Sequence, residues 1–99
     1  MKIYISGKIT GIEDEAFKLF EIAENKLKLH GYEVVNPMKL PHNHDKSWES
    51  YMKECIVALM SCDTIYMLSN YYMSKGAFLE IGLAKELGIM VIYEEYYLA

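Results

Sequence analysis

The sequence is poor in the features that mark membrane, secreted and disulfide-rich proteins. No apolar run approaches the roughly 18 residues that span a membrane, and the N-terminus does not have the basic and then apolar segments of a signal peptide. Only two of the 99 residues are cysteine, Cys55 and Cys62, and they lie seven residues apart in one stretch with a helical pattern. We therefore expect a cytosolic protein, with no membrane partner, in which both cysteines are free thiols of the core.

The sequence also lacks an excess of positive charge. Its 10 basic residues are outnumbered by 14 acidic ones, which gives a net charge of −4 and a pI of about 5.3. Proteins that bind DNA or RNA without sequence preference need a basic surface that displaces counterions, so a nucleic-acid partner is not expected. A small phosphorylated ligand is compatible with this charge, because backbone N–H groups at the start of a helix can hold it.

What the sequence does have is enough apolar material for one core. Hydrophobic residues make up 53% of the chain and charged residues 24%, which excludes a disordered, collagen-like or coiled-coil protein. There are no repeats, linkers or low-complexity stretches, so residues 1–99 are predicted to form a single domain. Nine of the thirteen aromatic residues are tyrosines. Such an enrichment is typical of half-buried surfaces, either a ligand pocket or a subunit interface.

Short apolar runs alternate with longer helical patterns along the chain. The predicted strands are residues 2–6, 32–35, 64–68 and 89–93, and the predicted helices are about 14–29, about 48–60 after an N-cap at Ser47, and about 76–87. Phe17, Met60 and Leu87 are expected to face inward on these helices, and residues 37–46 form the one long loop. This alternation predicts an α/β fold of three layers, in which a parallel four-stranded sheet of order 2-1-3-4 carries helices on both faces. Ligands of such sheets bind beyond the carboxyl ends of the strands, here between the first and third strands.

The turn after the first strand, Ser6 to Gly11, is punctuated by glycines. This pattern is typical either of a tight turn or of a loop whose backbone N–H groups bind a phosphate or a sugar. The patterns G-x-x-x-x-G-K-[ST] and G-x-G-x-x-G are absent, so NTPase and dinucleotide-binding functions are not supported. A phospho-acceptor receiver domain would have an acidic pair at this place, where Ser6 and Gly7 stand instead.

The turn before the last helix contains Ser74, Gly76 and Glu80. Ser74 either caps the helix or binds an anion, and a glycine at a helix start allows a ligand to approach the backbone. The positive end of the helix favours an ionised carboxylate at Glu80, which suits a nucleophile or an electrostatic stabiliser. The alternative is an ordinary solvated glutamate on a helix surface.

The polar segment His42-Asn43-His44-Asp45 and the nearby Glu54 are the remaining candidates. A metal site needs more ligands than this segment offers, so a polar loop that covers the pocket, or one held by its own hydrogen bonds, is favoured. Glu54 lies either on the surface or in the pocket, with the Tyr51 phenol near the same edge. Residues 71–73 (Tyr-Tyr-Met) are expected either to stack against a nucleobase or to contact another subunit of an oligomer.

Two of these segments carry a family resemblance. Tyr4-Ile5-Ser6-Gly7 at the first strand and Ser74-x-Gly76-x-x-x-Glu80-Ile81-Gly82 resemble the nucleoside 2-deoxyribosyltransferase superfamily, which includes the 2′-deoxynucleoside 5′-phosphate N-hydrolases. The likeness runs over about residues 2–93 and is strongest to short bacterial and phage members. It implies a flavodoxin-like fold, and it implies no metal and no organic cofactor.

The resemblance also implies roles for individual residues. Glu80 matches the glutamate that attacks C1′ of the deoxyribose, in the two-step manner of retaining glycosidases. Tyr4 would orient that carboxylate, and Glu54 lies near the acidic residue that protonates the leaving base. Ser74 falls where the hydrolases that use phosphorylated substrates carry a serine, which favours a 5′-phosphate. The expected substrate-binding residues, drawn from the two glycine-containing turns and the polar loop, are Ser6, Gly7, Lys8, Ser74, Gly76 and His44.

The sequence therefore predicts an N-glycosidase that cleaves the base–sugar bond of nucleoside or deoxynucleoside 5′-monophosphates. Two alternatives are a protein that binds a nucleotide or nucleotide-derived signal without cleaving it, and a transferase that moves deoxyribose between bases. Ser74 disfavours the transferase. Four strands and three helices leave a shallow cleft with little chain to cover it, so we also expect a homo-oligomer with tyrosines at the interface.

Overall fold

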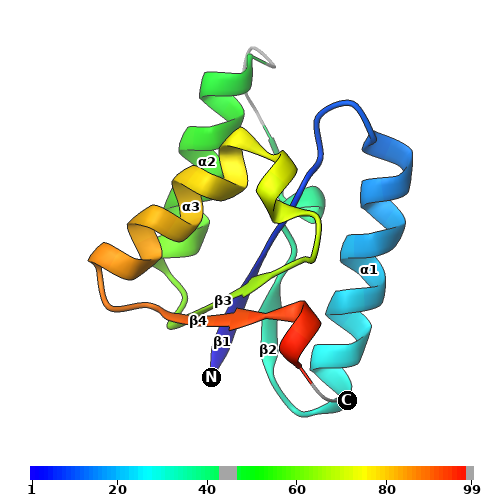
Figure 1. Cartoon of the computed structure of the whole chain (residues 1–99), viewed down its shortest axis with the longest axis vertical. Coiled ribbons are helices and arrows are strands. Elements are labelled where there is room, and N and C mark those ends of the chain that lie inside the picture. The colour runs from blue at the N-terminus through cyan, green and yellow to red at the C-terminus, as the bar shows by residue number, and fades with distance from the viewer. Residues whose placement is uncertain (43–46, 98–99) are drawn as a thin grey trace.

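The computed structural model, described here for residues 1–42 and 47–97, contains one parallel sheet between two layers of helices (Figure 1). The strand order is β2-β1-β3-β4, which confirms the predicted topology. The strands and helices, in chain order, are β1 (Lys2–Ser6), α1 (Glu13–Leu29), β2 (Glu33–Val35), α2 (Trp48–Met60), β3 (Thr64–Met67), α3 (Lys75–Glu86) and β4 (Met90–Tyr93). None of the described helices combines the length and apolar character needed to cross a membrane.

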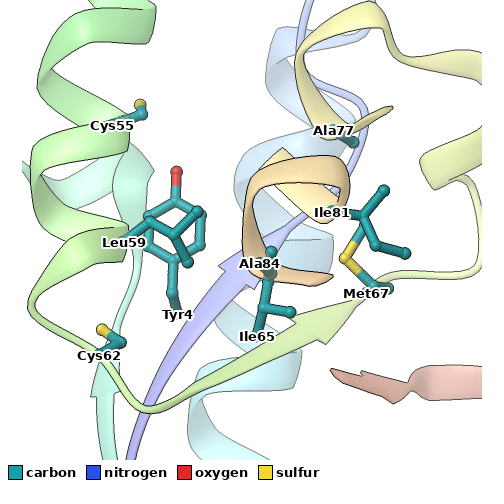
Figure 2. Close-up of a cluster of buried hydrophobic side chains, with 9 residues drawn as sticks. All are labelled: Tyr4, Cys55, Leu59, Cys62, Ile65, Met67, Ala77, Ile81 and Ala84. Carbon is teal, nitrogen blue, oxygen red and sulfur yellow. The ribbon is translucent and has the colours of Figure 1, made fainter. Parts of the chain in front are cut away.

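The two central strands supply side chains to both faces of the sheet. β1 and β3 are buried almost throughout, as expected for strands that are covered on both sides, and Tyr4 lies beside Ile65 in their register. On one face, Ile3 and Ile5 pack with residues of α1 such as Phe20. On the other face, the cluster of nine buried side chains in Figure 2 lies between the sheet and helices α2 and α3. The side chain of Tyr4 is therefore on the α2–α3 face.

The helix caps follow the sequence closely. The Ser47 side chain accepts a hydrogen bond from the Ser50 backbone N–H at 3.1 Å and begins α2, and Ser74 accepts one from Ala77 at 3.1 Å and begins α3. α1 ends at the predicted place, where Gly31 adopts a φ of +86° that other residues rarely adopt. The starts of α2 and α3 are thus both placed at the same edge of the sheet.

Three side chains expected to face inward are exposed. The buried positions of α1 are Ala16, Phe20, Ala23, Glu24 and Leu27, and Phe17 lies at the flank of that stripe. Met60 is the last residue of α2, and Leu87 lies beyond the end of α3, where neither helix still faces the sheet. The spacing of apolar residues therefore predicted too wide a buried face on α1 and too long a buried face on α2 and α3.

The connecting segments contain three short 3₁₀ helices that the sequence pattern did not show. They are η1 (Pro37–Lys39) within the predicted long loop, η2 (Tyr71–Met73) before α3, and η3 (Glu94–Tyr96) after β4. The Ser69 backbone N–H donates to Glu94 Oε1 at 2.9 Å, and the Tyr97 ring packs edge-on against Tyr66. The described part of the C-terminal segment is therefore docked on the domain.

Candidate active site

A cleft of about 550 Å³ opens at the carboxyl end of β1, between the starts of α2 and α3. Three parts of the chain line most of it: the end of β1 with the following turn, the first two turns of α2, and the first two turns of α3. Its polar lining residues are Tyr4, Ser6, Lys8, Thr10, Trp48, Glu49, Tyr51, Cys55, Ser74, Lys75 and Glu80. The cleft thus occupies the position at which parallel sheets of this order bind ligands.

Glu80 is the central polar group of this cleft. It is only 5% exposed, and each of its carboxylate oxygens accepts one hydrogen bond from β1. Tyr4 Oη donates to Oε2 at 2.6 Å, and Ser6 Oγ donates to Oε1 at 2.7 Å. Because successive strand residues point to opposite faces, residues 4 and 6 lie on the same side of β1 and reach the same carboxylate. Three residues expected at the site are therefore brought together around one anionic group.

Burial dominates the electrostatics of Glu80. It raises the pKa of the carboxyl group from 4.5 to about 7, and the hydrogen bonds from Tyr4 and Ser6 offset only part of that rise. The predicted effect of the helix start on this carboxyl group is outweighed by burial, because Glu80 is the sixth residue of α3 and the helix-end effect falls off within the first turn. The alternative of a solvated surface glutamate is wrong.

Tyr4 remains a hydrogen-bond donor under all ordinary conditions. Burial raises its pKa well above 10.0, and the neighbouring charge of Glu80 and the thiol of Cys55 raise it further. The phenol therefore keeps its proton, and the short contact with Glu80 is a charge-assisted hydrogen bond when the carboxyl group is ionised.

Positive groups gather at the start of α3. Lys8 Nζ donates to the carbonyl oxygen of Met73 at 3.3 Å, and its backbone N–H donates to Asn70 Oδ1 at 3.0 Å. Lys75 Nζ lies 4.5 Å from the centre of the Trp48 ring, in a cation–π contact between α3 and α2. Ser74, Lys75 and Gly76 line the cleft, and N–H groups in the first turn of a helix have no partner within that helix. This end of the cleft can hold an anion.

The two glycines of the site are explained by packing. A Cβ on Gly7 would lie 2.7 Å from Leu68 Cδ1, and a Cβ on Gly76 would lie 2.9 Å from Met52 Sδ. Gly7 thus allows the turn after β1 to lie against the end of β3, and Gly76 allows α3 to approach α2. Their contribution to ligand binding is limited to the shape of the cleft and the access to backbone N–H groups.

Glu54 and His44 are not brought into this cleft by the described structure. Glu54 is not among the lining residues, and its Oε2 lies 2.7 Å from Nδ1 of His42. The other ring nitrogen of His42 lies 2.9 Å from the Pro37 carbonyl oxygen. His44 lies outside the described residues. Within residues 1–42 and 47–97, no three His, Cys, Asp or Glu side chains are grouped so as to hold a metal ion.

Several lining residues were not predicted as functional. Trp48, Met52 and Cys55 were assigned to the apolar stripe of their helix, and Glu49 only to its first turn. The signal that identifies them is topological: α2 leads into β3, so its first turns lie at the carboxyl edge of the sheet, beside the start of α3. Tyr71, expected as a stacking wall or interface residue, packs against the rings of Phe78 and Tyr93.

Comparisons with known proteins agree with this architecture. A solved structure of a 2-deoxyribosyltransferase from the psychrotolerant bacterium Bacillus psychrosaccharolyticus, described as a biocatalyst for the synthesis of antiviral and antitumoral nucleosides, superposes with a TM-score of 0.73 at 24% sequence identity. The match covers 94% of this chain and 71% of that one, and it confirms the deoxyribosyltransferase-like fold. No curated protein sequence matches the chain. The family model described as a domain of unknown function, DUF4406, matches residues 1–93, and the chain is therefore a member of the DUF4406 family.

Proposed function

We propose that this protein is an N-glycosidase that cleaves the bond between base and sugar in nucleoside or deoxynucleoside 5′-monophosphates, with Glu80 as the nucleophile. The observation that carries the proposal is the Glu80 carboxylate, which is buried at the cleft wall with each oxygen held by one hydroxyl group. A solvated glutamate has neither feature. The likeness of the fold to a deoxyribosyltransferase supports a nucleoside-type ligand.

The geometry suits a two-step substitution at C1′ of the sugar. In the first step a Glu80 oxygen forms a bond to C1′, while the C1′–N bond breaks and its electron pair leaves with the base, which takes up a proton from water in the open cleft. In the second step water attacks C1′ and releases a proton to the solvent, the bond to Glu80 breaks, and the carboxylate is restored. Each Glu80 oxygen accepts one hydrogen bond and keeps a second lone pair, so Tyr4 and Ser6 can fix the nucleophile without blocking it.

The phosphate of the substrate is assigned to the start of α3. Ser74 lies six residues before Glu80, which corresponds to about 9 Å along the helix axis at 1.5 Å per residue. A sugar 5′-phosphate can bridge that distance, with C1′ in contact with a Glu80 oxygen at one end and a phosphate oxygen hydrogen-bonded to Ser74 at the other. The Ser74 oxygen accepts from Ala77, which leaves the hydroxyl proton for a phosphate oxygen, and Lys8 supplies a positive charge. In this arrangement Glu54 has no direct part, since His42 holds it outside the cleft lining.

The test is an assay of base release across a panel of ribo- and deoxyribonucleoside 5′-monophosphates and the corresponding nucleosides, followed by chromatography. The proposal predicts free base and sugar 5′-phosphate from at least one monophosphate. Formation of a new nucleoside when a second base is added would establish transfer instead. Saturable nucleotide binding by calorimetry without any turnover would establish a binding protein and contradict the proposal.

Replacing Lys8 by alanine is expected to weaken recognition of the phosphate. The KM for the monophosphate should rise about 10-fold, because one partly exposed charge-assisted hydrogen bond is lost, while turnover of the unphosphorylated nucleoside should be unchanged. Steady-state kinetics at two salt concentrations measure both effects. Lys18→Ala, which removes an exposed lysine of α1, is the matched control. An equal loss for nucleoside and monophosphate would contradict this role.

The expected homo-oligomer remains a prediction. Exposed apolar side chains near the cleft include Met73 and Phe78, which are 52% exposed each, and the neighbouring Tyr72, which is 62% exposed. A partner subunit would bury this surface and cover the open side of the cleft. Light scattering at micromolar concentration should give a mass of at least twice 11.5 kDa, and a strictly monomeric species would contradict the prediction.

We place the proposed reaction in the cytosol. Cys55 and Cys62 are both buried free thiols, as is usual for proteins of reducing compartments. Fractionation of cells that express the tagged chain measures this directly.

A further inference from the structure

The outward face of α3 carries a stripe of four exposed residues. They are Lys75, Leu79, Gly82 and Glu86. Their spacing of four, three and four residues keeps them within about 60° of one another around the helix, since each residue turns it by about 100°. The residues of α3 that pack in the cluster of Figure 2, Ala77, Ile81 and Ala84, lie on the opposite side. The stripe is thus the part of α3 farthest from the core.

Gly82 has no explanation within the subunit. A Cβ at this position would meet no atom of the described chain within 4 Å, whereas a Cβ at Gly76 of the same helix would lie 2.9 Å from Met52 Sδ. Glycine in the middle of a helix is less favourable than alanine, so Gly82 weakens α3 without any gain in packing. A surface glycine does allow a second helix to approach closely. The position therefore indicates a contact with another chain.

The stripe is complementary to itself when two copies of α3 pack antiparallel. Residues 75 and 86, and likewise 79 and 82, are equally far from a point midway between residues 80 and 81. A two-fold axis at that point places Lys75 level with Glu86 of the partner subunit, and Leu79 level with Gly82 of the partner subunit. Each contact occurs twice, so two opposite charges meet at both ends and a large side chain meets a glycine on both sides of the centre.

The charges favour a second copy in this orientation. Neither Lys75 nor Glu86 forms an ion pair within residues 1–42 and 47–97, and the Lys75 ammonium group lies 4.5 Å from the centre of the Trp48 ring. A parallel pair of helices would set each of these charges against its own kind. The antiparallel pair sets opposite charges level and also places the positive start of each helix beside the negative end of the other.

Exposed apolar side chains extend the contact beyond the stripe. Leu79 is 44% exposed and Phe78 is 52% exposed, and the same axis places Phe78 level with Leu83 of the partner subunit. Leu87, at the end of α3, is 58% exposed. Leu87 of the partner subunit would lie level with Ser74, which lines the cleft. One contact therefore covers apolar surface, as interface centres do, and brings the partner to the edge of the cleft.

We propose that two copies of the chain associate through α3, antiparallel and around a two-fold axis between residues 80 and 81. The second copy is favoured over any other occupant because the stripe complements itself in charge and in size. The inference adds a defined face and geometry to the predicted homo-oligomer, and it does not rest on the proposed function.

A cross-link at the centre of the contact tests the geometry directly. In two helices about 8 Å apart, positions 82 lie about 4.5 Å apart along the axis and their Cα atoms about 6 Å apart, which suits a disulfide. Mild oxidation of Gly82→Cys should give mostly covalent dimer on a non-reducing gel. Cys55 and Cys62 are buried and should not react. Lys18→Cys, at an exposed position of α1 across the sheet, is the matched control and should stay uncross-linked.

Two sets of variants test the same contact without cysteine chemistry. Gly82→Gln favours the helix but places a large side chain at the centre, so the dimer dissociation constant from sedimentation should rise at least about 100-fold, while Lys18→Gln should leave it unchanged. Lys75→Glu and Glu86→Lys should each raise the constant about 10-fold, because every dimer loses two ion pairs and gains two like-charge contacts. Both changes together restore opposite charges and should return it to within about threefold of the wild type.

The remaining outcomes would overturn the inference. They are a wild-type chain that stays monomeric at high micromolar concentration, a dimer that withstands Gly82→Gln, and a charge-exchanged double variant weaker than both single ones. A dimer that persists without the cross-link would show that another face joins the subunits. If Gly82→Gln does not fold, the charge variants still decide. None of these measurements involves a nucleotide, so failure to cleave one would affect only the proposed function.

Discussion

Replacing Glu80 by glutamine is expected to reduce base release by at least about 10³-fold. The substitution keeps the size of the side chain and one acceptor oxygen but replaces the nucleophilic carboxylate by a neutral amide, so the covalent step cannot occur. In the proposed mechanism only the ionised carboxylate attacks C1′, so the rate of the wild-type protein should rise with pH, reach half of its maximum near pH 7 and level off about one pH unit higher. Single-turnover assays with product chromatography measure both effects.

Two variants separate chemistry from binding. Glu80→Gln should bind the nucleoside monophosphate with an affinity close to that of the wild type by calorimetry, since the groups proposed to hold the phosphate, Ser74 and Lys8, are unchanged. Tyr4→Phe keeps the nucleophile but removes its 2.6 Å hydrogen bond, so it should lower the rate less than Glu80→Gln and move the acidic limb of the pH profile upward. Undiminished base release by Glu80→Gln would place the nucleophile elsewhere and refute the proposed mechanism.

The architecture was predictable because it depends on patterns that the sequence carries locally. β1 and β3 are apolar runs bounded by turn residues, and Ser47 and Ser74 begin their helices as expected. The right-handed connection rule then leaves few strand orders, and 2-1-3-4 is the one observed. The short 3₁₀ helices were missed because three residues have no periodicity from which to predict them.

The positions of the site residues could be predicted from the order of strands and helices in the sequence. Their burial and their contacts with distant segments could not. Tyr4, Ser6 and Glu80 meet because two strand positions on one face lie beside the second turn of α3. The raised pKa of Glu80 could not be predicted, since it results from burial by segments distant in the sequence. The same is true of Glu54, whose pairing with His42 depends on how η1 places the following residues.

A second buried glutamate, Glu24, contrasts with Glu80. It lies on α1 and accepts hydrogen bonds or ion pairs from Lys28 at 2.6 Å, Lys39 at 2.9 Å and Asn36 at 3.1 Å. Burial works against its ionised form, but these three partners outweigh that effect and lower its pKa from 4.5 to about 2. The cluster fastens η1, whose Pro37 lines the cleft, to α1. It therefore stabilises the fold and supports one wall of the site.

These two glutamates predict an unusual dependence of stability on pH. For Glu24, the unfolded chain binds the proton at higher pH than the folded one, so its stabilisation is complete above pH 4.5 and is lost as the pH falls toward 2. For Glu80 the sign is opposite: the folded state holds its proton up to about pH 7, so stability falls as the pH rises from 4.5 to 7 and is level above that. The free energy of unfolding should thus be greatest near pH 4.5–5.

Urea unfolding followed by circular dichroism from pH 2.5 to pH 8 tests this expectation. The free energy of unfolding should fall by about 3 kcal/mol between pH 4.5 and pH 7 because of Glu80. The Glu80→Gln variant should not show this fall, and it should be more stable than the wild type at pH 7.5. Glu24→Gln should instead remove about 2 kcal/mol at neutral pH, a figure reduced because Lys28 and Lys39 are half exposed, and it should flatten the acidic limb. Wild-type stability that stays level or rises between pH 4.5 and 7 would show that Glu80 is not held in a protonated, buried state. Stability lost in Glu80→Gln would show that its carboxylate supports the fold, whereas a gain is the mark of a group kept at the cost of stability for its chemistry.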